Sequence, residues 1–169
     1  MTDRKILKFL WVLGLVLLFP TLLKKPIKEH LIIFLLSSFF NTPLDNYLVS
    51  KDRLEYPVRL KNERKFTKGS FLYDSILCPL ITVWYYQSTR KIKKLSEIIL
   101  KTFLFTTPQV VLEALMERFT RTIKYKKGWK WYHSFIGIFL IKLYIRGFVG
   151  LINLISNAQH SSEKAKGTH

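Results

Sequence analysis

Apolar segments of membrane-spanning length alternate with basic connections along most of this chain, and that alternation limits its fold more than any other feature. The clearest segment is residues 6–23, ILKFLWVLGLVLLFPTLL, about the length that crosses a hydrocarbon core of ~30 Å. Although 49% of the residues are hydrophobic, 23% are charged, so the two kinds are segregated into blocks. Such blocks are typical of membrane spans and the loops between them.

Four more segments continue this pattern. The sequence therefore predicts an all-α fold, a polytopic transmembrane helical bundle of about five spans. The predicted spans are residues 6–23, 27–49, 71–87, 95–116 and 133–155, in a single domain over residues 1–155. No small-residue cleavage site follows the first span, so we expect an uncleaved anchor. Residues 156–169 are polar and lack periodicity, which predicts a disordered tail.

The distribution of basic residues predicts an orientation and a class of partner. Sixteen Lys and Arg lie at the N-terminus and in the 50–70 and 117–130 connections, against nine on the opposite side. Cytoplasmic loops carry the excess of Lys and Arg, so the N-terminus is expected in the cytoplasm. A formal charge of +17 also favours contact with anionic membrane lipids. Nucleic acid ranks low, because the charges lie at both membrane boundaries and do not form one groove.

One face of the fourth predicted span is polar. Its polar residues recur every three or four positions, which places them on one side of a helix. They are Thr102, Thr106, Gln109, Glu113, Glu117, Thr120 and Lys124. A carboxylate exposed deep in lipid costs roughly 2.5 to 3.5 kcal/mol on insertion scales. We therefore expect this face to point into the bundle or into a water-filled cavity.

The last predicted span carries two basic residues, Lys142 and Arg146, four positions apart on one face. With Gln109, Glu113 and Glu117 they form a predicted intramembrane polar network. We favour a structural role, in which the network fixes how the last two helices meet. A second hypothesis is that it lines a proton, ion or headgroup pathway. A third, an intramembrane hydrolase, has the least support.

A helical hairpin gives this network a predicted register. If the chain turns at residues 127–128, residues at equal depth have numbers that sum to 255. Glu113 then faces Lys142, and Gln109 faces Arg146. A slip of one turn stays open if the KYKKGWK connection is irregular.

The sequence contains no catalytic or metal-binding motif that we recognise. HExxH, GxSxG and glycine-rich phosphate loops are missing, and the four histidines are far apart in the chain. The single cysteine, Cys78, lies within a predicted span and is typical of an inert buried thiol. We therefore predict no enzymatic activity, no metal and no cofactor.

Two clusters outside the spans carry further candidates. In the longest connection, Pro57 holds Tyr56 extended, and Glu55 and Arg59 flank that rigid point and could pair. The surrounding basic residues are expected to attract anionic phospholipid. Tryptophans near the ends of spans are expected to anchor at the headgroup level. They are Trp84, Trp129 and Trp131.

Three stretches together resemble a known family. They are KKPIKEH at 24–30, LEYPVR at 54–59 and LEALMERFTRTIKYKKGWKWY at 112–132. The family consists of small multi-pass membrane proteins of uncharacterised function in bacilli and clostridia, with an EYPxR loop followed by an ExxxExYTxxIKYxxxWxW segment. Phe119 stands where that pattern has Tyr. The resemblance implies the cytoplasmic membrane of a Gram-positive bacterium, and it implies no activity.

These observations lead to two main functional hypotheses. The first is a non-enzymatic accessory or assembly component that contacts a membrane protein partner or lipid headgroups. The second is a small transporter or channel that uses Glu113, Lys142 and Arg146. It would form a homo-oligomer, because so few helices cannot easily enclose a path.

Overall fold

The structure is a computed structural model that describes residues 3–58, 70 and 72–166. Helices make up most of this part of the chain, which confirms the all-α prediction. They are α1 (Asp3–Leu22), α2 (Ile27–Ser50), the π-helical segment η2 (Tyr73–Leu77), α3 (Cys78–Thr89), α4 (Leu95–Phe119) and α5 (Trp131–Lys166). Two short strands complete the described elements, β1 (Leu54–Glu55) and β2 (Lys124–Tyr125).

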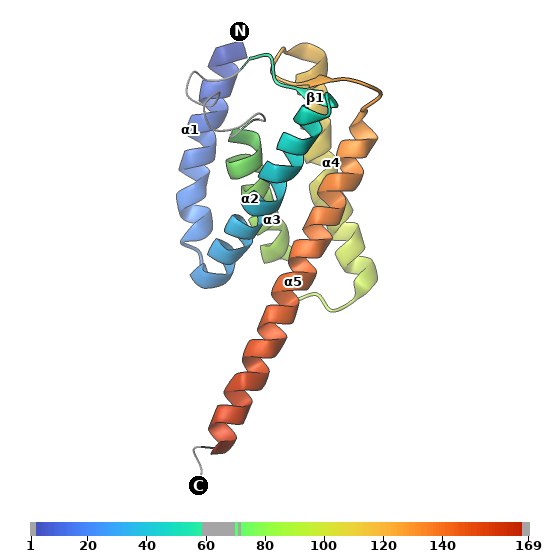
Figure 1. The fold of residues 1–169 in the computed structure, drawn as a ribbon. Coiled ribbons are helices and arrows are strands. Elements are labelled where there is room, and N and C mark those ends of the chain that lie inside the picture. Colours follow the sequence, from blue (N-terminus) through green and yellow to red (C-terminus); the bar gives the residue numbers. More distant parts are fainter. Residues whose placement is uncertain (1–2, 59–69, 71, 167–169) are drawn as a thin grey trace.

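Successive helices run in alternating directions along one bundle, and the two termini lie at opposite ends (Figure 1). Helix α3 is central, because it contacts each of the other four α-helices. Most of its residues are buried. The largest apolar cluster brings α2, α3 and α5 together, and its buried members are Ile33, Val83, Tyr86, Ile145 and Val149.

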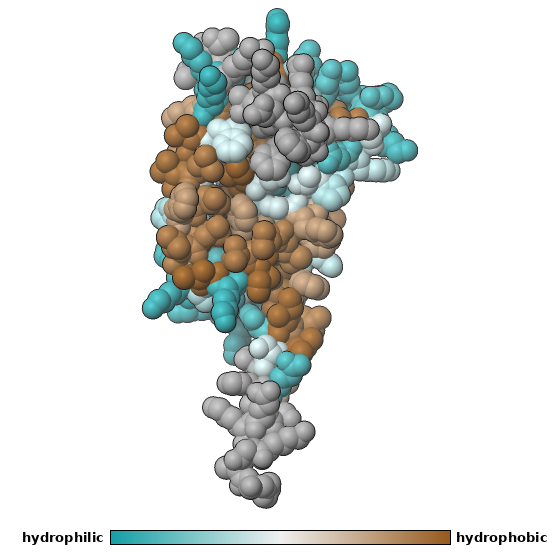
Figure 2. Space-filling view, turned by 60° about the vertical axis from the view of Figure 1, so that its left-hand side comes forward, coloured by the Kyte–Doolittle hydropathy of each residue, from teal (hydrophilic) through white to brown (hydrophobic). Residues whose placement is uncertain are grey.

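The outer surface of the bundle is suited to lipid. Among the described residues, three helices are long and apolar enough to cross a membrane, α1, α4 and α5. Apolar side chains cover the middle of the face in Figure 2, and hydrophilic ones lie above and below them. Large apolar side chains such as Phe19 and Leu100, each 67% exposed, point outward. Helices α2 and α3 lie alongside these helices and keep polar residues buried.

The last helix is longer than the sequence predicted. Helix α5 continues beyond Ile155 to Lys166, through residues that we expected to form a disordered tail. The physical reason is that residues 156–166 contain neither proline nor glycine, the two residues that most disfavour a helix. The third span was predicted to begin at residue 71, which lies outside the described residues.

The two basic connections at one end of the bundle join in a small ribbon. Strands β1 and β2 pair antiparallel, with Leu54 opposite Tyr125 and Glu55 opposite Lys124. The chain then turns at Lys127 and Gly128, which have φ of 45° and 77°. Glycine suits such a left-handed turn position because it has no Cβ. The ribbon therefore places the EYP motif against the IKY motif, although about 70 residues separate them in the chain.

Candidate functional site

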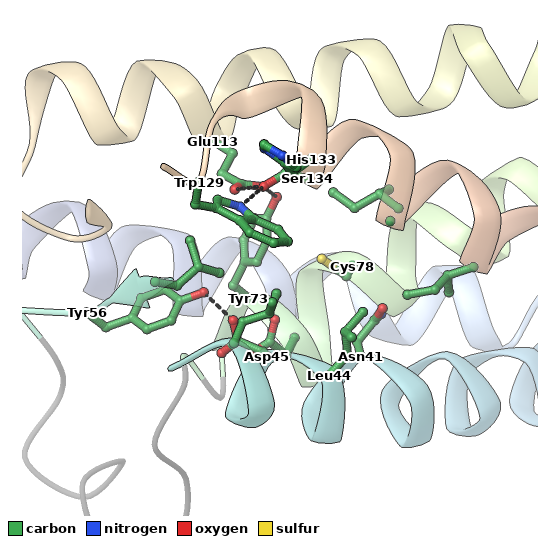
Figure 3. A pocket seen from close by; sticks show the side chains of 16 residues that line it. Asn41, Leu44, Asp45, Tyr56, Tyr73, Cys78, Glu113, Trp129, His133 and Ser134 are labelled. Carbon is green, nitrogen blue, oxygen red and sulfur yellow. Dashed lines mark hydrogen bonds between the residues drawn. The ribbon is translucent and has the colours of Figure 1, made fainter. Parts of the chain in front are cut away.

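A cavity of about 160 Å³ lies between α2 and α5, directly beneath the ribbon (Figure 3). Three carboxylates from the described residues line it, Asp45, Asp74 and Glu113. Its apolar lining comes mainly from α2, β1 and α5. These residues are Leu44, Leu48, Leu54, Ile138 and Ile141. Since one water needs only about 10–15 Å³ of such space, the cavity can hold several waters or a small polar group.

The cavity lies close to one end of the bundle. Asp45 precedes the end of α2 by five residues, and Glu113 precedes the end of α4 by six. At 1.5 Å per residue, both carboxylates lie about 7–9 Å from the helix ends.

Glu113 is held by hydroxyl groups from three other elements. One carboxylate oxygen accepts hydrogen bonds from Ser134 at 2.7 Å and Tyr125 at 2.9 Å. The other accepts from Tyr73 at 3.3 Å. Only 4% of Glu113 is exposed, and it has no ion-pair partner among the described residues. A buried carboxylate is thus fixed by neutral donors at the edge of an open space.

Asp45 receives its partners from the connection that carries the EYP motif. The Tyr56 hydroxyl donates to one Asp45 oxygen at 2.7 Å, and the Ser70 amide donates to the other at 3.3 Å. Burial, together with the nearby Asp45 charge, raises the pKa of Tyr56 well above its usual value, so the hydroxyl remains a donor. Proline at position 57 restricts Tyr56 to extended backbone, and Tyr56 enters the bundle beside the cavity.

Trp129 closes the cavity at the ribbon. Its indole nitrogen donates to the Ser134 hydroxyl at 3.0 Å, and its ring stacks on His133 at 5.0 Å. Figure 3 shows Glu113, Trp129 and Ser134 gathered on the side of α4 and α5, with Asp45 and Asn41 on the side of α2. Trp129 is therefore part of the candidate site and is more than an interfacial anchor.

The predicted pairing of Glu113 with Lys142 is wrong. The Lys142 ammonium, 1% exposed, donates to the Gln109 side-chain oxygen at 2.6 Å. The Gln109 nitrogen in turn bonds the Cys78 sulfur at 2.9 Å. The expected turn position is correct, but α4 already ends at Phe119, and the chain from there to α5 is largely non-helical. The numbers of Gln109 and Lys142 sum to 251, so the two helices lie one turn away from the predicted register, which is the slip that stayed open.

Arg146 does not face Gln109 either. Its guanidinium donates to the backbone carbonyl oxygens of Thr89 at 3.1 Å and Ile92 at 2.7 Å. These carbonyls lie at and just beyond the C-terminal end of α3, where helix carbonyls lack intrahelical partners and the dipole favours a cation. Arg146 thus caps a neighbouring helix.

Of the other predicted residues that the structure describes, Tyr56 lines the cavity and the rest do not. Glu117 is half-buried one turn beyond Glu113. Glu55 pairs with Lys126 at 2.7 Å, an ion pair that raises the pKa of Lys126, while Arg59 lies outside the described residues. Near the other end of the bundle Trp84 donates to the Thr21 hydroxyl at 2.9 Å. Trp131 is 56% exposed, as an interfacial side chain would be.

Several residues of the cavity were not predicted from the sequence. Asp45 and Asp74 are acidic residues inside predicted spans, a signal that could have found them. Tyr73, Tyr125 and Ser134 carry no comparable signal, because tyrosine and serine are common in many settings.

The polar side chains below the cavity are packed tightly. Cys78, Gln109 and Lys142 border a gap with about 0 Å³ of space for water. In the described part of the chain, no group of three or more metal-ligating side chains is placed to hold a metal ion. The site is therefore a closed-ended cavity whose chemistry is that of a carboxylate with hydroxyl donors, which suits a ligand with a positive charge.

Comparisons with known proteins give no relative: no family model, curated protein or solved structure matches the chain. The fold with its three apolar, span-length helices places the protein in the class of polytopic helical membrane proteins.

Proposed function

We propose that this protein is a non-enzymatic membrane protein that binds the headgroup of a phospholipid carrying a primary amine. The observation that carries the proposal is Glu113, a buried carboxylate at a cavity, held by three hydroxyls and by no cation among the described residues. A buried charge is costly unless it is paired. The ammonium of the ligand supplies that pair.

A basic groove next to the cavity supports the same ligand. The groove is lined by Tyr47, Leu48, Lys51, Arg53, Lys127, Trp129 and His133. It shares Leu48, Trp129 and His133 with the cavity, so the two adjoin each other at these side chains. Lys127 pairs with Asp52 at 2.8 Å, and Lys51 and Arg53 line the same groove, so the groove offers positive charge to a phosphate next to an ammonium at Glu113. A negative charge in the cavity and positive charges in the groove are complementary to a zwitterionic headgroup, which carries an ammonium and a phosphate.

The apolar wall of the cavity accounts for a lipid in preference to a soluble amine. Asn41, Leu44 and Leu48 lie on successive turns of α2, facing Gly137, Ile138 and Ile141 on α5. Leu44 is 40% exposed, and a Cβ added at Gly137 would meet no atom within 4 Å. This space between the helices leaves room for the glycerol end of a lipid.

An accessory role in the membrane follows from this binding, with the cavity end of the bundle on the cytoplasmic side and the N-terminus in the cytoplasm. The excess of Lys and Arg at that end supports this orientation. The resemblance to the family of bacilli and clostridia supports a bacterial cytoplasmic membrane. The anionic lipids expected from the charge would surround the same basic connections.

A transporter is the second candidate. The polar chain from Cys78 through Gln109 to Lys142 continues deeper into the bundle from the cavity and favours it. The lack of space for water at that level favours binding over conduction. Proton or ion flux into vesicles that Glu113→Gln abolishes would decide for transport.

Gly137→Leu is expected to weaken binding of phosphatidylethanolamine at least tenfold, because the new side chain fills the entrance to the cavity. Charged hydrogen bonds contribute about 1.5–3 kcal/mol each, and 1.4 kcal/mol is tenfold in affinity. Binding is measured in nanodiscs of phosphatidylcholine with increasing phosphatidylethanolamine, using native mass spectrometry.

Gly147→Leu is the matched control, because Gly147 lies on the same helix with open space around it. It is expected to bind like the wild type. Equal binding of phosphatidylethanolamine by the wild type and Gly137→Leu would contradict the proposal. So would a wild-type protein that does not prefer phosphatidylethanolamine to phosphatidylcholine.

A further inference from the structure

A second pocket lies at the opposite end of the bundle from the Glu113 cavity. It has a volume of about 330 Å³. The connection between α1 and α2, the first turn of α2 and the C-terminal end of α3 form it. Its lining residues are Lys24, Lys25, His30, Gln87, Arg90 and Lys91. None of these residues belongs to the site described above.

The floor of this pocket carries unsatisfied polar groups. His30 is 1% exposed, and neither ring nitrogen has a hydrogen-bond partner among the described residues. The Lys24 backbone carbonyl is close enough to act on the ring electrostatically, but its geometry is not that of a hydrogen bond. The side-chain nitrogen of Gln87 is likewise buried without a partner in the described part of the chain. A buried polar group without a partner costs about 1–3 kcal/mol, so such groups usually mark a site filled by something else.

The unsatisfied nitrogens on the floor and the basic side chains at the rim are suited to the same kind of ligand. The Gln87 nitrogen is a donor, and an imidazole N–H can donate as well. Four cations, Lys24, Lys25, Arg90 and Lys91, surround them with exposed side chains. The carboxylate closest in sequence, Glu29, already accepts a hydrogen bond from Tyr86 at 3.2 Å. Donors at the floor and positive charge at the rim are complementary to an anion.

We propose that this pocket binds a phosphate group, with His30 and Gln87 donating to its oxygens from the floor and the four basic residues neutralising its charge. The N-terminus of α2, which begins at Ile27, adds the positive end of a helix dipole beside the same pocket. The phosphate comes from an anionic phospholipid in the leaflet opposite the Glu113 cavity, or from free phosphate in the adjoining water.

The test compares two double variants that remove the same charge from the same connection. Arg90→Gln with Lys91→Gln changes the rim, whereas Lys93→Gln with Lys94→Gln changes two neighbouring residues outside the pocket lining. Binding of phosphatidylglycerol is measured against a phosphatidylcholine background by native mass spectrometry. The rim variant is expected to lose at least tenfold in affinity, and the neighbouring variant less than threefold. Equal losses would show general surface attraction and overturn the proposal.

His30→Phe tests the floor separately. It removes both unsatisfied nitrogens, so the variant should be at least as stable as the wild type in lipid-free detergent while losing phosphatidylglycerol binding at least tenfold. A titration of the wild type with inorganic phosphate in the same detergent identifies the source. Saturable binding that the rim variant weakens assigns free phosphate, and binding of phosphatidylglycerol alone assigns the lipid. If neither probe binds, or if His30→Phe binds phosphatidylglycerol like the wild type, the site is not there.

Discussion

Glu113→Ala is expected to destabilise the folded protein by on the order of 3 to 5 kcal/mol. The change leaves three hydroxyls, those of Tyr73, Tyr125 and Ser134, without their common acceptor in a buried setting. It also separates groups from η2, β2 and α5 that this carboxylate holds together. The free energy of unfolding in mixed micelles measures the effect.

Glu117→Ala provides the control for that experiment. Glu117 lies one turn further along α4 and is only half-buried, so its loss should cost no more than about 0.5 kcal/mol. Glu113→Gln should fall between the two, because the amide oxygen can still accept while the charge is gone. Equal stability of Glu113→Ala and Glu117→Ala would show that the hydroxyl cluster does not form.

A double-mutant cycle on Gln109 and Lys142 should give the second large effect. Lys142→Met alone removes the partner of the Gln109 oxygen, and Gln109→Leu alone leaves a buried ammonium without its acceptor. The latter single change is expected to cost about 3–5 kcal/mol. The combined Gln109→Leu and Lys142→Met variant should regain most of this loss, because a buried polar pair replaced by apolar residues of similar volume is often neutral.

The same cycle distinguishes the observed register from the one expected of a simple hairpin. The coupling between Gln109 and Lys142 should reach about 3 kcal/mol, the upper end of the range for residues in direct contact. The coupling between Glu113 and Lys142 should be clearly smaller. A larger coupling for the Glu113 pair would restore the sum-to-255 register and contradict the contacts described here.

The periodicity of the sequence was enough to predict which face of α4 is buried. Of the predicted stripe, Thr102, Thr106, Gln109 and Glu113 are buried. Glu117 and Thr120 are half-buried, and Lys124 is exposed in β2, beyond the end of α4. The physical reason is that polar side chains facing lipid are costly, so a helix with a polar stripe turns that stripe toward the inside of the bundle. Most helix bounds were predictable because basic connections separate the apolar segments, although α5 runs past its predicted end to Lys166.

The partners of those residues could not be predicted in the same way. Two-residue strands have no recognisable pattern, so the pairing of Leu54 with Tyr125 was not expected. That ribbon takes up the chain after Phe119 and changes which turns of α4 and α5 lie side by side. Tertiary contacts of this kind depend on residues far apart in the sequence, and local patterns do not encode them.

The cavity itself lay beyond sequence reasoning for a further reason. Its carboxylates come from three different helical segments, and neither Asp45 nor Asp74 was predicted as a site residue. The cavity exists because the side chains of α2 and α5 do not fill the space between the two helices. The sequence of either helix alone does not show this. Gly137 is an example, because its missing side chain matters only where α5 borders the cavity.

Carbodiimide coupling tests most directly whether a lipid amine lies against Glu113. A membrane-permeant carbodiimide activates a carboxyl group, the amine of phosphatidylethanolamine attacks it, an amide bond forms and a urea leaves. Peptide mapping by mass spectrometry then locates the adduct. The account predicts a phosphatidylethanolamine adduct on Glu113 or the adjoining cavity carboxylates, much reduced in Gly137→Leu. Adducts confined to exposed carboxylates such as Asp52 and Glu97, with Glu113 unmodified, would contradict it.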